Sequence, residues 1–388
     1  MSFDADDLRR AAARLANQPE FGPDPFAENL ARLLAALAEG GTLTPSGLEI
    51  TRAELTGYLR NRLDVQRWLR EVPEIESQTV EKPIFFMGLP RSGTTFLLNL
   101  FDHDPRLRLL RVWEGREPTP PPALAPASVA RRIEAARQFL GQWQGDVEGF
   151  DALHMLDADG PDECTMLLAI AFAQAGFPNY LNVPGWFAWM VESLDFEAAY
   201  RLHKQQLQIL QWQAPARRWA LKFPNHVLAI PAIRRVYPDA SFVFTHRDPD
   251  TALASLCSLT HEFRSARNEP NEREPIGEEM SAFVAKHVER ILEYRASGVL
   301  SGCTVVDVDY YRLVADPVAV SEEIYRGLGM SMSPEVEARL ARFSRANPKG
   351  KRGAHQYAAA DFALDPRRTE SVFSAYRTRF GVRQEASR

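Results

Sequence analysis

Hydrophobic residues recur at helical spacing through the first 80 positions of the chain. Leucines lie three or four residues apart in two stretches, which are Leu30, Leu33, Leu34 and Leu37, and then Leu55, Leu59 and Leu63. This spacing places each set on one face of a helix, and Pro45 and Gly47 mark the break between the helices. The pattern predicts a helical extension over residues 1–80. We expect it to pack on the rest of the chain or to shape a binding pocket, rather than to act alone.

After residue 80 the pattern changes to short apolar runs separated by helical stretches. The runs are rich in β-branched and aromatic residues and predict strands at 84–87, 218–223, 240–247 and 303–310. The intervening patterns predict helices from about Thr94, over residues 230–236, from about Thr251, and over residues 277–300. Strands that alternate with helices indicate an α/β fold, with a P-loop-like central parallel sheet flanked by helices. Residues 81–388 are expected to form this domain.

Composition and charge narrow the classes of function. The chain has 388 residues, of which 45% are hydrophobic and 25% charged, as in ordinary globular proteins. A formal net charge of −5 argues against a general nucleic-acid surface, but it leaves room for a local basic pocket that binds one small anion. The three cysteines are far apart and show no CxxC spacing, so no metal site is predicted.

The apolar stretches predict neither a membrane span nor a signal peptide. The longest one, from Met166 to Phe177, is far shorter than the roughly 20 residues that a bilayer requires. Asp and Arg residues precede any apolar run at the N-terminus, unlike in a secretory signal. We therefore expect a cytoplasmic protein, and the sequence leaves open whether it forms a homodimer.

A candidate phosphate-binding loop follows the first predicted strand. Residues 88–95 read GLPRSGTT, which has the GxxxxG frame of a P-loop followed by two small polar residues, Thr94 and Thr95. Backbone amides in such a loop converge on a phosphate, and the helix N-terminus favours negative charge. A nucleoside triphosphatase has Lys where Thr94 stands, whereas here the cation is Arg91, inside the loop. The loop is therefore suited to one phosphate and poorly equipped for a magnesium–triphosphate complex.

The PRSGTT sequence resembles the 5'-phosphosulfate-binding loop of sulfotransferases that use 3'-phosphoadenosine 5'-phosphosulfate (PAPS). An Arg at the position of Arg91 is similar to tyrosylprotein sulfotransferases and many bacterial members, while cytosolic members have Lys. The resemblance covers the chain from about Pro83 to the C-terminus. It implies that Arg91, Ser92, Gly93, Thr94 and Thr95 bind the donor, PAPS, and that no metal is required.

Three further segments fit the same family, in the expected order. In THRDPDTALASL, Arg247 closes a strand and Ser255 follows eight positions later, which resembles the element that binds the 3'-phosphate. In LKFPNH, Lys222 corresponds to the Lys that lies near the bridging oxygen and the sulfuryl group. In NPKGKRGAHQY, Lys349 and Gly350 match part of a basic donor-binding segment. A solvated surface loop remains the alternative for this last segment.

The sequence leaves the catalytic base open. An acceptor hydroxyl must lose a proton during attack, so a general base is required. Glu114 lies at about the distance after the loop at which tyrosylprotein sulfotransferases place a Glu base, and His226 is the second candidate because cytosolic members use a His after the Lys. His226 follows Lys222 by four positions rather than two. Glu163 and His154 rank below these candidates.

The resemblance thus implies transfer of a sulfuryl group from PAPS to a hydroxyl of a small-molecule acceptor, with release of adenosine 3',5'-bisphosphate. Arg91, Lys222 and one of Glu114 and His226 would carry the reaction. An aromatic-rich stretch, Phe177 to Trp189, is a candidate for the acceptor pocket. Two alternatives are a P-loop small-molecule kinase and a relative that binds PAPS without catalysis. Neither nucleic acid nor a membrane is expected as a partner.

Overall fold

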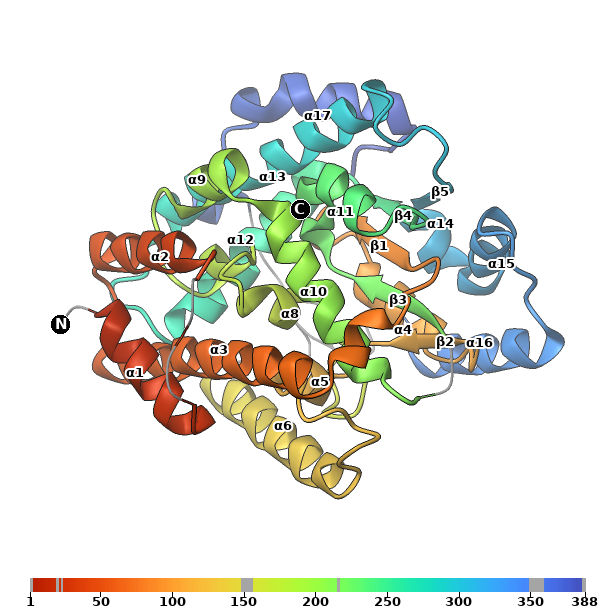
Figure 1. Ribbon diagram of the computed structural model, residues 1–388. Helices are drawn as coiled ribbons and strands as arrows, with labels where there is room; N and C mark the ends of the chain where they lie inside the picture. The colour runs from red at the N-terminus through yellow and green to blue at the C-terminus, as the bar shows by residue number, and fades with distance from the viewer. Residues whose placement is uncertain are drawn as a thin grey trace.

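A parallel five-stranded sheet forms the centre of the molecule, with strand order β2-β3-β1-β4-β5 (Figure 1). The structure is a computed structural model that describes residues 3–18, 21, 24–147, 156–214, 217–348 and 359–385. The strands are β1 (Ile84–Gly88), β2 (Leu107–Leu109), β3 (Arg218–Lys222), β4 (Ser241–His246) and β5 (Val305–Asp309). The predicted fold class, a parallel sheet flanked by helices, is therefore confirmed.

The edge strand β2 is the element that the sequence pattern did not predict. It has three residues, Leu107 to Leu109, and pairs in parallel with β3. A run of this length shows no periodicity of its own, so only the pairing with β3 identifies it as a strand.

The helices cover both faces of the sheet and build the N-terminal part of the chain. At the N-terminus they are α1 (Ala5–Ala16), α2 (Ala27–Gly40) and α3 (Pro45–Glu71). Between the first and fourth strands they are α4 (Thr94–Phe101), α5 (Val112–Arg116), α6 (Ala127–Asp146), α8 (Thr165–Ala169), α9 (Trp186–Ser193), α10 (Phe196–Gln211) and α11 (Ile230–Val236). The remainder are α12 (Pro249–Ser265), α13 (Arg273–Ala296), α14 (Tyr310–Ala315), α15 (Pro317–Gly327), α16 (Pro334–Ala346) and α17 (Pro366–Phe380). The helix expected at 277–300 begins and ends earlier, as α13.

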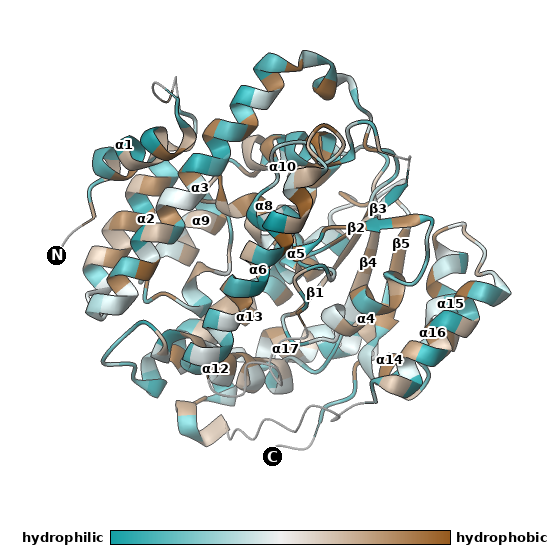
Figure 2. Ribbon diagram, turned by 90° about the horizontal axis from the view of Figure 1, so that it is seen from below, coloured by the Kyte–Doolittle hydropathy of each residue, from teal (hydrophilic) through white to brown (hydrophobic). Residues whose placement is uncertain are grey.

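Two hydrophobic cores lie on opposite faces of the sheet, because successive side chains of a strand point to opposite sides. Phe86 and Val243 join a core with α4, α15 and α16. Phe85 and Phe242 join a larger core with α8, α10, α11, α12 and α13. In Figure 2 the strands are among the most hydrophobic segments, whereas α15 and α16 show hydrophilic outer surfaces. Lys222 pairs in register with Phe86, so its side chain lies on the α4 face of the sheet.

The N-terminal helices pack against the rest of the chain, as expected. Thr44 caps α3 through its side chain and Pro45 occupies the first helical position, which explains the break that the sequence predicted there. Buried leucines of all three helices belong to the same core as β1. Asn29 donates a hydrogen bond to the carbonyl of Ala171 at 2.9 Å. Figures 1 and 2 both place α1–α3 on the side of the molecule opposite α15 and α16. A domain boundary at residue 80 stays a prediction.

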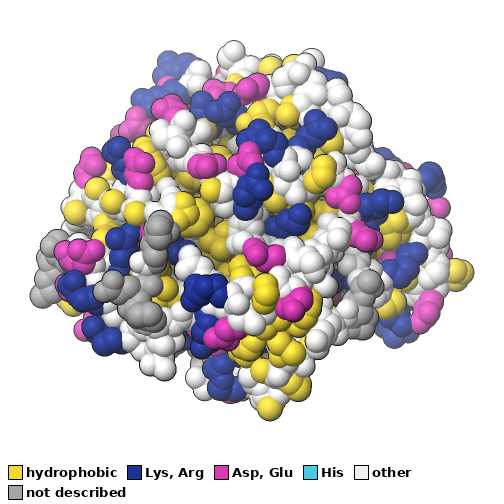
Figure 3. Space-filling model, viewed as in Figure 1, with side chains coloured by type: hydrophobic (Ala, Val, Ile, Leu, Met, Phe, Trp, Pro, Cys, Tyr) yellow, Lys and Arg dark blue, Asp and Glu magenta, His cyan; other side chains and the backbone are white. Residues whose placement is uncertain are grey.

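Neither a membrane-spanning helix nor a large patch of like charge is seen in the parts of the molecule described below. Within the described ranges, no helix combines the length and the apolar character needed to cross a membrane. Figure 3 shows basic and acidic side chains interspersed over the face that it displays, rather than gathered by sign.

Candidate functional site

The loop between β1 and α4 has a shape that its own sequence dictates. Gly93 has a φ of +88° and Arg91 a φ of +65°, so the chain turns twice through the left-handed region. A Cβ atom at Gly93 would lie 2.9 Å from the ring of Tyr310, so no larger residue fits without a shift. The buried Ser92 hydroxyl shares a hydrogen bond with Oγ1 of Thr245 on β4 at 2.7 Å. The loop is thereby fixed across the carboxyl edge of the sheet.

The two segments that the sequence singled out as donor-binding elements are in direct contact. Nε of Arg91 donates to Oγ of Ser255 on α12 at 3.1 Å. Nη1 of Arg247, which follows β4, donates to the backbone carbonyl of Arg91 at 2.8 Å. Arg91 and Arg247 are 156 positions apart in the sequence. Adjacent parallel strands β1 and β4 bring them together, because their carboxyl ends meet at one edge.

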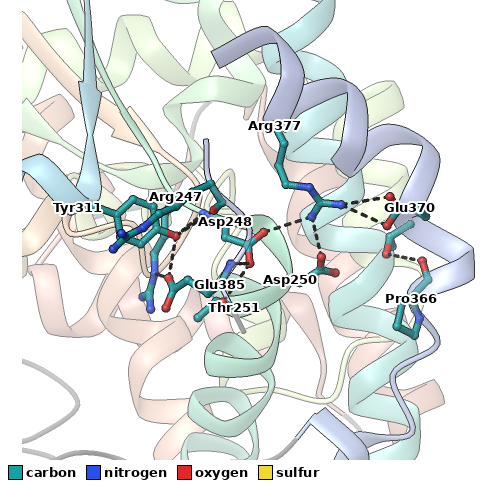
Figure 4. A network of polar contacts seen from close by, with 11 residues as sticks. Arg247, Asp248, Asp250, Thr251, Tyr311, Pro366, Glu370, Arg377 and Glu385 are labelled. Atoms are coloured by element: carbon teal, nitrogen blue, oxygen red, sulfur yellow. Dashed lines mark hydrogen bonds and ion pairs between the residues drawn. The ribbon is translucent and has the colours of Figure 1, made fainter. Parts of the chain in front are cut away.

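Arg247 sits in a network of charged and aromatic side chains, which Figure 4 shows from close by. Its guanidinium carbon lies 4.4 Å from the centre of the Tyr310 ring, a cation–π contact. Its Nε donates to Oε1 of Glu385 at 3.0 Å, and the hydroxyl of Tyr311 donates to the same oxygen at 2.8 Å. The chain near its C-terminus therefore reaches the edge of the candidate site. The sequence analysis missed Tyr310 and Glu385, although Tyr310 follows β5 and strand ends are where such residues gather.

Lys222 closes β3 and reaches the first turn of α4. Its side chain is 1% exposed, and Nζ donates to Oγ1 of Thr95 at 2.9 Å. Nζ also forms a short ion pair with Glu163, whose side chain is 20% exposed. The cation thus lies beside the loop and the helix N-terminus, where an anionic ligand would be bound. The expected place of Lys222 beside the bridging oxygen and the sulfuryl group stays a prediction.

Glu163 is held in place by its neighbours along the chain. The amide of Asp162 donates to the carbonyl of Leu110, and the amide of Cys164 donates to the carbonyl of Lys222, each at 2.8 Å. These two backbone bonds fasten the segment to Leu110, which follows β2, and to the end of β3. Withdrawal from water raises the pKa of the adjacent Asp162 to about 6. The sequence ranked Glu163 low, since nothing along the chain links it to Lys222 across 59 positions.

Glu114 is buried and both of its carboxylate oxygens are engaged. Oε1 accepts from Nη2 of Arg108 at 2.7 Å, and Oε2 accepts from the amide of Arg111 at 3.0 Å. The carboxylate therefore caps the first turn of α5 and ties that helix to the edge strand β2. This arrangement gives Glu114 a structural task, while its proposed catalytic role stays an untested prediction.

His226 packs within the larger core. Its Nδ1 lies 2.5 Å from the hydroxyl of Tyr200, and its ring makes an edge contact with Phe85 at 5.0 Å. Phe85 and Phe86 point to opposite faces of β1, so His226 contacts the face opposite to the one that Lys222 occupies. Burial lowers the pKa of the imidazole well below its usual range. Lys349, Gly350 and His154 lie outside the described residues.

A cavity of about 740 Å³ lies between α3, α5, α6 and the end of α12. Tyr58, Asn61, Arg116, Trp143, Met166 and Arg267 are among the residues that line it. Met166 is three positions after Glu163, so the segment that carries this carboxylate continues into the wall of the cavity. The helical extension and the sheet domain thus both contribute to the cavity.

The aromatic stretch that the sequence singled out for an acceptor pocket divides into two groups. Tyr180 packs edge-on against Trp143 at 6.2 Å, and Phe177 packs against Tyr58 at 6.4 Å, so both lie behind the cavity wall. Phe187 instead stacks on Phe283 at 4.4 Å, within the larger core. The stretch supports the cavity wall at one end and serves core packing at the other.

No cluster of three or more His, Cys, Asp and Glu residues within the described ranges is placed to hold a metal ion. The charges gathered at the edge of the sheet are instead Arg91, Lys222 and Arg247, together with the carboxylates of Glu163 and Glu385. Guanidinium and ammonium groups next to a helix N-terminus suit phosphate and sulfate oxygens.

Comparison with known proteins agrees with this geometry. The model of the sulfotransferase family matches residues 83–334. Sulfotransferase STF9 from Mycobacterium avium superposes with a TM-score of 0.87 at 27% identity, over 100% of both chains. Sulfotransferase STF1 from Mycobacterium tuberculosis H37Rv superposes with a TM-score of 0.79 at 29% identity, over 96% of this chain and 99% of that one. No curated protein matches. Because the family model spans more than half of the 388 residues and the fold agrees along the whole chain, the protein belongs to the sulfotransferase family.

Proposed function

We propose that the protein transfers a sulfuryl group from PAPS to a hydroxyl of a small-molecule acceptor and releases adenosine 3',5'-bisphosphate. One observation carries this proposal. Cations from the ends of β3 and β4 converge on the loop that follows β1, where Lys222 contacts Thr95, and Arg247 contacts the backbone of Arg91. Three neighbouring strands therefore supply positive charge for a nucleotide with two anionic ends.

Different residues would bind the 5'-phosphosulfate and the 3'-phosphate of the donor. The loop from Arg91 to Thr95 lies at the start of α4, whose first amides have no acceptor within the helix. These amides, with Arg91, would bind the 5'-phosphosulfate. Arg247 and Ser255, which lie on the far side of Arg91, would bind the 3'-phosphate. Lys349 and Gly350 are proposed to add to the donor site.

Lys222 is the group best placed to assist the transfer. Negative charge builds up on the 5'-phosphate oxygen as the bond to sulfur breaks, and a fixed cation beside that oxygen lowers the barrier. Two of the three Nζ hydrogens are directed to Thr95 and Glu163. The third would serve the donor. Arg91 and the loop amides would stabilise the same charge, so the chemistry calls for no metal.

The acceptor would bind in the cavity between α3 and α6. Its volume of about 740 Å³ falls within the range of sites for small molecules, which is roughly 300–1,000 Å³. Aromatic side chains, Tyr58 and Trp143, share the wall with polar groups, Asn61 and Arg267. A ring-sized hydroxyl compound with a polar substituent suits such a lining.

A P-loop kinase is the alternative that the loop frame suggests. Such an enzyme uses a Lys directly after the second glycine of the loop, and Thr94 stands there. Lys222 comes from another strand and is paired with Glu163, so it does not reproduce that Lys. Transfer of phosphate from MgATP, without transfer of sulfate from PAPS, would favour the kinase.

The test is a transfer assay with ³⁵S-labelled PAPS and a panel of phenols and aliphatic alcohols. We expect label to appear in at least one sulfate ester, in equal amount to the adenosine 3',5'-bisphosphate formed. Nucleotide binding without transfer to any member of the panel would favour the non-catalytic alternative instead.

A further inference from the structure

We propose that Glu163 is the general base that takes the proton of the acceptor hydroxyl. This inference rests on the proposed function, because it assigns a role within sulfuryl transfer. The roles proposed for Lys222 and the donor loop are unchanged. The choice of base differs from the sequence prediction, which favoured Glu114 and then His226.

Position is the first argument. The carboxylate of Glu163 contacts Nζ of Lys222, and the same Nζ donates to Oγ1 of Thr95 at 2.9 Å. Glu163 is therefore one side chain removed from the N-terminus of α4, where the phosphosulfate would be bound. A base must lie beside the nucleophile, and the nucleophile must approach the sulfur from the side opposite the leaving phosphate. We place the acceptor on the side of Glu163, whose segment continues to Met166 in the cavity wall.

Exposure is the second argument. Lys222 is 1% exposed and Glu114 4%, whereas the side chain of Glu163 retains 20% of its surface. An acceptor could therefore reach this carboxylate without unfolding its surroundings. The two backbone bonds that flank Glu163, from Asp162 to Leu110 and from Cys164 to Lys222, fix its position to that of Lys222. A pre-positioned base of this kind needs no rearrangement of the chain.

The earlier candidates, Glu114 and His226, are both buried. Both oxygens of Glu114 accept hydrogen bonds, from Arg108 and from the amide of Arg111. His226 lies in the core on the opposite face of β1, with Nδ1 directed at Tyr200. Asp162 points its Oδ1 at the amide of Glu163, at 2.7 Å. In the described part of the chain, the carboxylate paired with Lys222 is that of Glu163.

The chemistry balances without a further reactant. Glu163 accepts the hydroxyl proton while the acceptor oxygen forms its bond to sulfur. The bond between sulfur and the bridging oxygen breaks, and its electron pair stays on the 5'-phosphate of adenosine 3',5'-bisphosphate. Lys222 contacts Glu163 and would direct its third Nζ hydrogen to the departing oxygen.

The experiment compares Glu163→Gln with the wild type, and Glu279→Gln serves as the matched control. Glu279 pairs with a buried cation, Arg264, and its side chain is 25% exposed, so its pair resembles that of Glu163 with Lys222. We expect Glu163→Gln to lower kcat by about 100- to 10,000-fold, the usual contribution of a general base. Its affinity for adenosine 3',5'-bisphosphate should change less than threefold. The Glu279→Gln enzyme should keep its kcat within threefold.

A series of substituted phenols then separates a base from a group that only positions Lys222. A phenol whose pKa lies below the assay pH is already ionised and needs no base. The loss caused by Glu163→Gln should therefore shrink at least tenfold from the least to the most acidic phenol. An equal loss across the series would overturn the proposal, as would a Glu163→Gln enzyme with undiminished kcat.

Two further outcomes, a variant that does not fold and a wild-type protein without activity, are distinguished as follows. If Glu163→Gln does not fold, Glu163→Asp is measured instead. The proposal then predicts that the acidic limb of the pH profile of kcat/KM differs between Glu163→Asp and the wild type. An unchanged limb would contradict the proposal. A wild-type protein that transfers sulfate to no phenol or alcohol refutes the proposed function, and the role of Glu163 with it.

Discussion

Nε of Arg247 donates a hydrogen bond to Oε1 of Glu385 at 3.0 Å, so the guanidinium assigned to the donor's 3'-phosphate is paired with a carboxylate from the C-terminal segment. Glu385 is anchored in turn, because its amide donates to Oδ2 of Asp248 at 3.0 Å. Figure 4 shows that this contact belongs to a chain of hydrogen bonds and ion pairs that continues to Arg377 on α17. A phosphate that approaches Arg247 would meet this carboxylate.

Removal of the Glu385 carboxylate should therefore tighten donor binding. We expect Glu385→Gln to increase the affinity for adenosine 3',5'-bisphosphate roughly three- to fivefold, since a partly exposed ion pair contributes up to about 1 kcal/mol. Calorimetric titration at constant ionic strength measures the change. Glu370→Gln is the control, because Glu370 pairs with Arg377 and not with Arg247. Weaker binding in Glu385→Gln would show that the carboxylate orients Arg247 instead of competing with the phosphate.

Loss of the Lys222 charge should affect catalysis more than binding. We expect Lys222→Met to lower kcat by about 100- to 1,000-fold, as removal of one donor to a developing anion does in other enzymes. Steady-state kinetics with saturating PAPS gives the value. Lys222→Arg keeps the charge and should retain more activity than Lys222→Met. Equal rates in the two variants would contradict a role for the charge.

The cavity can be filled from α3 at a position where space is free. A Cβ atom at Gly57 would meet no atom within 4 Å, and Gly57 lines the cavity. Gly57→Phe should raise the acceptor KM at least tenfold and leave bisphosphate affinity unchanged. Gly57→Ala is the control, and it should stabilise the protein by about 1 kcal/mol because glycine disfavours a helix interior. An unchanged acceptor KM in Gly57→Phe would place the acceptor outside the cavity.

Buried histidines should make the fold sensitive to acid. Burial lowers the pKa of His203 to about 3 and that of His287 to about 4, below the ordinary value of about 6.5 in an unfolded chain. As pH falls below about 6.5, the unfolded chain binds protons that these residues do not bind in the fold, so stability decreases. Each group contributes up to about 1.4 kcal/mol per pH unit. Asp162, with a pKa raised to about 6, acts in the opposite sense.

Urea unfolding at pH 7.5 and pH 5.5 measures this effect. We expect a lower free energy of unfolding at pH 5.5, with a smaller difference in His203→Phe. Tyr237→Phe removes the hydrogen-bond partner of His203 and keeps the ionisable group, so it should preserve the difference. A wild-type stability that does not fall between the two pH values would rule out buried neutral histidines.

Much of the sheet domain could be predicted from the sequence, because its signals are local. The apolar runs, the glycines of the loop and the spacing between Arg247 and Ser255 identified four of the five strands and the two candidate donor-binding segments. Parallel pairing of β1 with β3 and β4 then brings Lys222 and Arg247 to one edge, as the order of the segments indicated.

The other features of the candidate site depend on contacts between distant segments, and the periodicity of the sequence carries no information about such contacts. Glu114 lies in the first turn of α5 and accepts from the amide of Arg111, a local capping role that has no distinctive sequence pattern. The contact of Glu163 with Lys222 arises only because two backbone bonds fasten residues 162 and 164 to other segments. Glu385 and Arg247 are 138 positions apart, so the sequence pattern could not predict their pairing either.

The most direct test of the account is calorimetric titration of the protein with adenosine 3',5'-bisphosphate, with MgATP as the control ligand. We predict tight binding of the bisphosphate, which Arg247→Ala abolishes and Arg91→Ala weakens, together with weak or no binding of MgATP. Binding of MgATP without binding of the bisphosphate would contradict the assignment of the donor site and favour the kinase instead.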